Sequence, residues 1–310
     1  MTWLKSRRLQ YLLSLTALLF GLFTVFRAVF YLGFSDLASV LSVSRADVLT
    51  AWGIGLRFDL RLAILTVLPL AVLAWLPLFN LGRSPLARLL GRVYLALALL
   101  ALVFVYFMDF GYYAYLADRL NVTALRFLED AAISARMMWE SYPIVWLVLA
   151  WLAISALFIW LAYQLERRFF VRQPAQVPGW QKPLAVAVVL VAMVHGILGR
   201  VSDINYANPI PLRWDEAFTT GNDQLGALGL NPVIYFYSTL IVPAQPYDEA
   251  LVAEFYLAMA EYLSLPQEQA TELGFVREVP PQPHALPGDR PLNIVFIMLE
   301  SLGASRVGAY

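Results

Sequence analysis

The sequence contains no cysteine, only two histidines and few charged residues. Without cysteine, no disulfide can stabilise an exported part, and no thiol can act as a nucleophile or a metal ligand. Charged residues make up 14% of the chain, and 22 lysines and arginines balance 22 aspartates and glutamates. Because the formal net charge is zero, nothing in the overall charge favours nucleic acid, and we predict no such partner.

The residues that are abundant are apolar. Hydrophobic residues make up 60% of the chain and the mean hydropathy is +0.66, far above the usual values for a soluble domain. A helix needs about 20 apolar residues to cross a bilayer. Five stretches meet this requirement, and they predict a mainly α fold with a five-helix transmembrane bundle over residues 1–200: Leu9–Tyr31, Arg61–Phe79, Leu89–Phe110, Pro143–Tyr163 and Pro183–Leu198.

The first stretch could instead be a secretory signal, because Lys5, Arg7 and Arg8 precede it. Its apolar run is long, however, and no small-residue cleavage site follows, which favours a retained anchor. Basic residues near the spans set the predicted orientation, since they remain on the cytoplasmic side. Ten of them fall on the amino-terminal side of the bundle: Lys5, Arg7, Arg8, Arg83, Arg88, Arg92, Arg167, Arg168, Arg172 and Lys182. We therefore predict a multi-pass protein of the cytoplasmic (inner) membrane, with a cytoplasmic amino terminus and an extracytoplasmic carboxyl part.

Two regions outside the spans are predicted to form extracytoplasmic interfacial helices. The connection between the third and fourth spans has a helical stretch through Met138, which suits a helix lying along the outer membrane face. Residues 201–278 form a juxtamembrane segment, and within it Tyr247–Leu263 has an apolar stripe at helical spacing. This second helix could pack on a neighbouring domain or on the membrane interface, and the sequence leaves both alternatives open.

Four charged residues lie near the outer ends of the first two predicted spans: Arg27, Arg57, Asp59 and Arg61. Guanidinium groups bind phosphate through bidentate hydrogen bonds, so these residues could hold the phosphate of a lipid headgroup. The alternative is that the arginines extend to the membrane surface or that a structural ion pair forms. A single histidine in the fifth span, His195, is predicted to be a hydrogen-bonded packing residue.

The carboxyl-terminal region changes character again. Residues 279–291 contain five prolines and predict a stiff linker, in which His284 has no evident metal partner. The segment NIVFIMLES that follows has the pattern of a short buried strand with Glu300 at its carboxyl end. In open α/β sheets that edge carries ligands and metals, so Glu300 is a candidate metal ligand. We expect residues 292–310 to begin an α/β catalytic domain, and the chain to be the front part of a larger protein.

Three of these features together resemble one family. They are the five spans with an outside carboxyl part, the segment RLN (119–121) followed by a helix and ESYP (140–143), and NIVFIMLESLGASRVGAY (293–310) after a proline-rich linker. The combination resembles the lipoteichoic-acid-synthase-like enzymes of the alkaline phosphatase and sulfatase superfamily. The resemblance covers essentially the whole chain, and the final motif is its strongest part.

The resemblance implies a metal-dependent transferase of the cell envelope. Such an enzyme takes phosphoglycerol from phosphatidylglycerol, the membrane lipid donor, and passes it to a glycan or glycerophosphate polymer acceptor. The implied cofactor is a divalent metal, Mn²⁺ first, with Mg²⁺ or Zn²⁺ as alternatives, and its ligand maps onto Glu300. Ser301 follows the ligand and is not the implied nucleophile. A threonine nucleophile and further ligands are expected downstream, so no catalytic residue is assigned within residues 1–310 and this part alone is expected to be inactive.

Two alternatives remain open. One is a phosphoethanolamine transferase or a membrane-bound sulfatase of the same superfamily; the lack of cysteine disfavours the first, and Glu rather than Asp at the strand end disfavours the second. The other is a non-enzymatic membrane module or a transporter, which the scarcity of polar residues at mid-span disfavours.

Overall fold

The computed structural model describes residues 7–34, 43–75, 84–170, 181–200, 210–241, 248–265 and 274–276. The chain divides into two compact units, Met1–Pro243 and Ala244–Tyr310, and each is described by itself. All regular structure in the described part of the chain is helical, as the sequence predicted. The predicted linker at 279–291 and the predicted strand before Glu300 lie outside the described residues.

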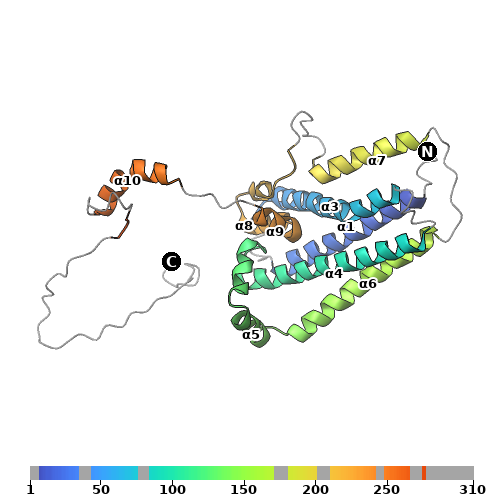
Figure 1. The fold of residues 1–310 in the computed structure, drawn as a ribbon, viewed down its shortest axis with the longest axis horizontal. Coiled ribbons are helices and arrows are strands. Elements are labelled where there is room, and N and C mark those ends of the chain that lie inside the picture. Colours follow the sequence, from blue (N-terminus) through green and yellow to red (C-terminus); the bar gives the residue numbers. More distant parts are fainter. Residues whose placement is uncertain are drawn as a thin grey trace, which may run out of the picture. The chain divides into compact units, whose positions relative to one another are not determined.

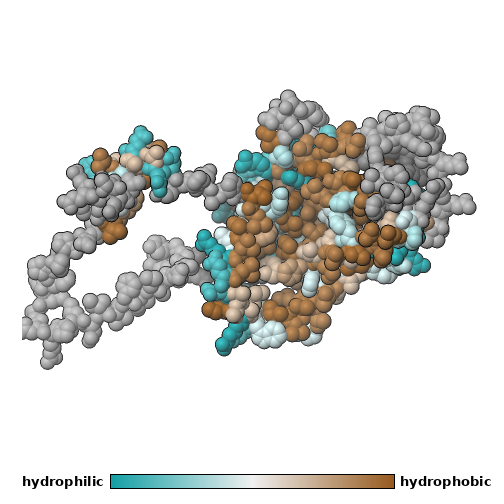
Figure 2. All heavy atoms as spheres, in the orientation of Figure 1, coloured by the Kyte–Doolittle hydropathy of each residue, from teal (hydrophilic) through white to brown (hydrophobic). Residues whose placement is uncertain are grey.

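Long helices occur at all five positions where spans were predicted: α1 (Arg7–Phe34), α3 (Arg45–Trp75), α4 (Pro85–Leu116), α6 (Ile144–Phe170) and α7 (Gln181–Leu198). Three of them, α1, α4 and α6, are long and apolar enough to cross a membrane. These three helices indicate a membrane protein. Figure 2 shows that the surface of the first unit is also largely apolar. Brown apolar residues run along its helices, and teal hydrophilic residues gather toward the helix ends.

Helix α1 lies at the centre of the first unit. It packs against α3, α4 and α6, and α7 packs on the other side of α3 (Figure 1). Its buried face repeats at helical spacing through Leu15, Leu19 and Phe23, and Leu99 and Val103 of α4 belong to the same core cluster. This packing fixes the register of α1 against α3 and α4, and it thereby decides which charged residues of those helices meet.

Local sequence signals determine where α4 begins and ends. Ser84 caps its amino terminus by accepting a hydrogen bond from the backbone N–H of Ala87, and Pro85 occupies the first turn, where its missing N–H is no loss. At the other end Ala117 adopts the left-handed conformation, with φ of 56°, and its N–H donates to Tyr113 O. The helix therefore stops sharply, and the chain turns back into the segment 118–121.

Short helices close the end of the bundle where α4 stops: η3 (Val122–Leu128), α5 (Ala131–Ser141), η4 (Trp214–Phe218), α8 (Asp223–Gly229) and α9 (Pro232–Leu240). Helix α8 packs mainly on α3 and η4, and α9 packs on α4. Helix α5 corresponds to the helix predicted through Met138, which is thus confirmed as a helix. These short elements bring residues of segment 210–241 onto the ends of the long helices.

An ion pair joins α4 to α6 near the opposite end of the bundle. The Arg92 guanidinium donates from Nε and Nη2 to the two carboxylate oxygens of Glu166, at 2.8 Å each, and it lies 4.8 Å from the ring centre of Tyr163. At the same end the rings of Tyr11 on α1 and Phe170 on α6 are 5.1 Å apart. The start of α1 and the end of α6 therefore lie side by side.

The second unit contains α10 (Glu249–Leu263), which confirms the predicted helix there. Asp248 caps it by accepting hydrogen bonds from Ala250 N and Leu251 N. Its buried side holds Tyr256, whose hydroxyl donates to Gly274 O at 2.6 Å. The residues of the predicted apolar stripe are exposed in the described part of the chain: Leu251, Phe255, Ala258, Met259 and Tyr262.

Candidate functional site

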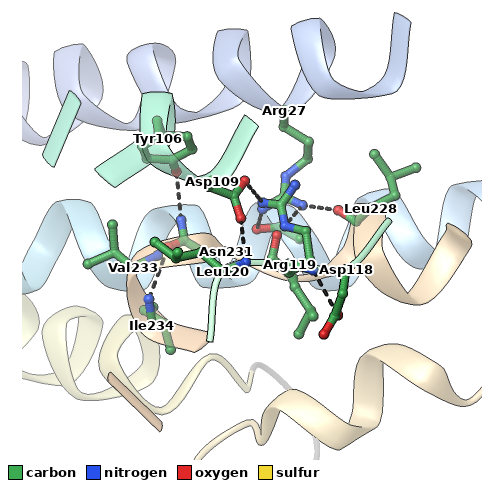
Figure 3. Close-up of polar contacts among 12 residues, drawn as sticks. Arg27, Tyr106, Asp109, Asp118, Arg119, Leu120, Leu228, Asn231, Val233 and Ile234 are labelled. Carbon is green, nitrogen blue, oxygen red and sulfur yellow. Dashed lines mark hydrogen bonds and ion pairs between the residues drawn. The ribbon is translucent and has the colours of Figure 1, made fainter. Parts of the chain in front are cut away.

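A network of buried polar side chains lies where the short helices close the bundle (Figure 3). Its centre is an ion pair between Arg27 of α1 and Asp59 of α3, whose side chains are 4% and 0% exposed. The pair is bidentate, with Nε–Oδ2 at 2.8 Å and Nη2–Oδ1 at 2.7 Å. Its low exposure means that the two charges are compensated by each other and by hydrogen bonds rather than by water.

Backbone carbonyl groups take the remaining donors of Arg27. Nη2 also donates to Gly55 O at 2.9 Å, and Nη1 donates to Leu230 O at 3.1 Å and to Leu228 O. With the two bonds to Asp59, the five N–H groups of the guanidinium all have acceptors within the protein. Arg27 therefore joins α1, α3, the end of α8 and the residue that follows α8 in one polar contact.

Asn231 extends the network to α4. Its Nδ2 donates to Asp59 Oδ1 and to the hydroxyl of Tyr106, both at 2.8 Å. Its Oδ1 caps the amino terminus of α9 by accepting from Val233 N and Ile234 N. A single asparagine, 1% exposed, thus starts a helix and ties that helix to two long helices of the bundle.

A second buried ion pair holds the turn after α4. Asp109 accepts a hydrogen bond from Leu120 N at 2.9 Å, and its other oxygen lies 3.3 Å from Nη2 of Arg119. The Arg119 guanidinium also stacks over the ring of Phe30 of α1, 4.1 Å from its centre. Burial away from water lowers the pKa of Arg119 from its ordinary value, and the carboxylate of Asp109 opposes that shift.

The segment RLN (119–121) is built into this network. Asn121 caps η3 by accepting from Thr123 N at 2.9 Å, and its Nδ2 donates to Asp118 Oδ2 at 2.8 Å. Both Arg119 and Asn121 are buried. The residues of this segment therefore position the turn between α4 and η3.

A small cavity of about 10 Å³ lies inside the network, between Phe26, Phe30, Tyr106 and Arg119 among others. Arg119 lines this cavity, and its Nε is buried without a hydrogen-bond partner in the protein. Asp109 Oδ2 is also buried without a hydrogen bond, although it forms the ion pair with Arg119 Nη2. A space of this size is about enough for one water molecule. The network has room for a water molecule but not for an organic ligand. Its role is therefore structural, since it fixes the arrangement of the surrounding segments.

The structure divides the four residues predicted to hold lipid phosphate into two pairs. Arg27 and Asp59 form the structural ion pair that was the alternative for these residues. Arg57 is exposed on α3, and Arg61, one turn later and half-buried, donates from Nη1 to Leu212 O at 3.1 Å. Arg57 and Arg61 thus stay close to each other on one helix, while the donors of Arg27 are already occupied. The imidazole Nδ1 of His195 lies 2.9 Å from Val191 O one turn earlier.

The predicted metal ligand Glu300 and the neighbouring His284 lie outside the described residues. Within the residues that are described, no group of three or more histidine, aspartate or glutamate side chains could hold a metal ion. The metal assignment of Glu300 therefore stays a prediction from the sequence.

The network residues Tyr106, Asp109 and Asn231 had no assigned role in the sequence, and Arg119 entered only as part of the segment RLN. Asp109, at the end of an apolar run, resembled an ordinary charged residue of the following connection, and Asn231-Pro232 resembled a turn. One signal was available, since an asparagine before a proline is also the pattern of a helix start. Their partners lie as far as 172 residues away in the chain, as Asp59 and Asn231 do, so no local pattern could reveal the pairing.

Comparison of the chain with protein-family models, with curated proteins and with solved structures finds no match.

Proposed function

We propose that this protein is the membrane part of a metal-dependent phosphotransferase of the cell envelope, which moves phosphoglycerol from phosphatidylglycerol to a glycan or glycerophosphate polymer. In this transfer the bond between phosphorus and the diacylglycerol oxygen breaks, and a bond to an acceptor hydroxyl forms. The hydroxyl proton ends on the diacylglycerol that leaves. The proposal rests on the resemblance stated for RLN, ESYP and the segment around Glu300.

The membrane arrangement is part of the proposal. Helices α3 and α7 join α1, α4 and α6 as spans, the amino terminus is cytoplasmic, and the buried network lies toward the extracytoplasmic side. The observation that supports this best is the position of the segment RLN. Arg119 and Asn121 are buried, and the next residue, Val122, donates a backbone hydrogen bond to the Thr239 hydroxyl, which joins this segment to residues 210–241.

The residue proposed to bind the metal is Glu300. Its carboxylate supplies the hard oxygen donor that Mn²⁺ or Mg²⁺ prefers. A bound divalent metal would stabilise negative charge on the transferring phosphoryl group.

The test uses the full-length protein in vesicles that contain phosphatidylglycerol labelled in its acyl chains. We expect diacylglycerol to form when Mn²⁺ is present and to stop forming when the metal is chelated. Glu300→Ala should abolish this turnover at matched expression, whereas Glu261→Ala, an exposed carboxylate of α10, should leave it unchanged. Undiminished turnover in Glu300→Ala would refute the metal assignment. Diacylglycerol formed only from phosphatidylethanolamine would favour the phosphoethanolamine alternative, and none from either lipid would favour a non-enzymatic module.

A second prediction concerns Arg57 and Arg61, which we propose to hold the phosphate of the donor lipid. Each cation near a membrane surface contributes attraction worth roughly fivefold in affinity for anionic lipid. Replacing both with glutamine should therefore raise the apparent KM for phosphatidylglycerol by about tenfold or more, with kcat little changed. The matched control is Arg136→Gln, which removes an exposed cation paired with Glu140 on α5. An unchanged KM in the double variant would show that Arg57 and Arg61 do not bind the donor lipid, which leaves the alternative that they extend to the membrane surface.

A further inference from the structure

A groove of about 440 Å³ runs between α1 and α6. Ser14, Ala17 and Leu18 line it on α1, and Leu161, Gln164 and Arg168 line it on α6. Its volume lies within the range of about 300–1,000 Å³ that is typical of small-molecule sites. The wall from Leu161 to Arg168 covers about 10 Å of helix length. The groove is therefore long enough for a substantial part of an extended apolar chain.

Small side chains on α1 leave this space open. Ser14 and Ala17 stand three residues apart on one face of the helix, so neither fills the gap toward α6. Gly21 continues the same face, and a Cβ there would meet nothing within 4 Å. By contrast, the opposite face of α1 carries Leu15 and Leu19, which are fully buried in the core. The groove thus belongs to the outer surface of an apolar helix pair rather than to the core.

Among the described residues that line the groove, Arg168 alone is charged, and it lies at one end. Arg168 lines it with an exposed side chain, and among the described residues it forms no ion pair. Two neighbouring cations have partners within the protein. Arg92 pairs with Glu166, and the Arg167 guanidinium lies 5.8 Å from the ring centre of Tyr163. The groove therefore combines a mainly apolar wall with a guanidinium at one end.

That end is also the basic end of the bundle. The contact between Tyr11 and Phe170 places the start of α1 beside the end of α6. Arg7 and Arg8 open α1 there, and Arg88 and Arg92 lie in the first turns of α4, which meets α6 through the pair of Arg92 with Glu166. A cluster of cations next to a membrane attracts anionic headgroups.

We propose that the groove binds one anionic phospholipid, with an acyl chain along the apolar wall and the phosphate paired with Arg168. An anionic lipid fits better than a second protein chain because the site joins a mainly apolar groove to one cation, which matches a tail and a phosphate. The site lies at the opposite end of the bundle from Arg57 and Arg61. It does not depend on the transferase activity proposed above, because it needs only a membrane that contains anionic lipid.

The experiment measures lipid binding to the purified protein in detergent by native mass spectrometry. The probes are dioleoyl phosphatidic acid, which has no headgroup to transfer, and dioleoyl phosphatidylcholine. We expect one phosphatidic acid per protein at the lowest lipid concentrations, bound more tightly than phosphatidylcholine. Arg168→Gln should weaken phosphatidic acid binding by roughly fivefold, whereas Arg167→Gln, the same charge change one residue away, should alter it by less than about twofold.

A second pair of variants tests the acyl chain. Ala17→Leu should fill the groove and weaken binding of both lipids, while Ala101→Leu, an exposed alanine of α4 outside the groove, should not. Thermal unfolding of all four variants would confirm that each is folded. Equal effects of Arg168→Gln and Arg167→Gln would overturn the phosphate site, and equal binding by Ala17→Leu and Ala101→Leu would overturn the groove. A dimer that retains no lipid and is lost in Ala17→Leu would assign the groove to a second copy of the chain.

Discussion

Replacing Asp59 with alanine is expected to lower the free energy of unfolding of the first unit by about 3–5 kcal/mol. The change leaves the Arg27 guanidinium buried without its counter-charge, in a position where water does not reach it. Asn231 loses one of its two acceptors at the same time. In thermal unfolding in detergent, the midpoint should fall by on the order of 10 °C.

The effect should depend on burial rather than on the loss of a carboxylate. Glu140→Ala breaks an ion pair with Arg136 on α5, whose side chains are 61% and 81% exposed, and it should cost at most about 0.5 kcal/mol. The double variant Arg27→Met/Asp59→Leu removes both charges and should recover much of the lost stability. Equal midpoints for Asp59→Ala and Glu140→Ala would show that the buried pair contributes little to stability.

Replacing Gly55 with alanine should also disrupt the network, although it changes no charge. A Cβ at this position would overlap the Arg27 guanidinium, including its Cζ and Nη1 atoms. Arg27 would have to move away from Asp59 and from Gly55 O, and its donors would lose their alignment. Overpacking of this kind costs about 1–3 kcal/mol, and each unsatisfied polar group adds to it.

Gly53 provides the matched control one half-turn earlier on α3. A Cβ there would meet nothing within 4 Å, so alanine should be tolerated. Alanine is favoured over glycine in a helix interior by about 1 kcal/mol, so Gly53→Ala should leave the unfolding midpoint unchanged or raise it. The two substitutions are chemically identical, but of the two we expect Gly55→Ala alone to lower the midpoint. A rise in both variants would show that Arg27 has room to move.

The helices of this protein were predictable because their signals are local. A run of about 20 apolar residues must form helix in a bilayer, where each backbone polar group needs a partner within the segment. Helices α1, α4 and α6 accordingly appear where apolar runs predicted them, and α10 appears where the pattern has helical spacing. The strand before Glu300 and its metal role remain predictions, because residues 277–310 lie outside the described part.

The buried network was only partly predictable. The sequence singled out Arg27 and Asp59 because charges in apolar segments are costly, and an ion pair was one of two interpretations. Nothing in the sequence indicated that Asn231 would bridge Asp59 to Tyr106. Those contacts depend on the register of α1, α3 and α4 and on where the turn at Ala117 directs the chain.

By itself, the sequence determined that this is a mainly helical membrane protein, because apolar runs and helical spacing act over one or two turns. Only the tertiary structure decided the partners of its charged residues. Packing places Arg27 against Asp59, leaves Arg57 exposed, and opens a groove beside Arg168. A side chain's partner depends on helix register and on the volumes of neighbouring residues. Both are properties of segments distant in the chain, and no local pattern encodes them.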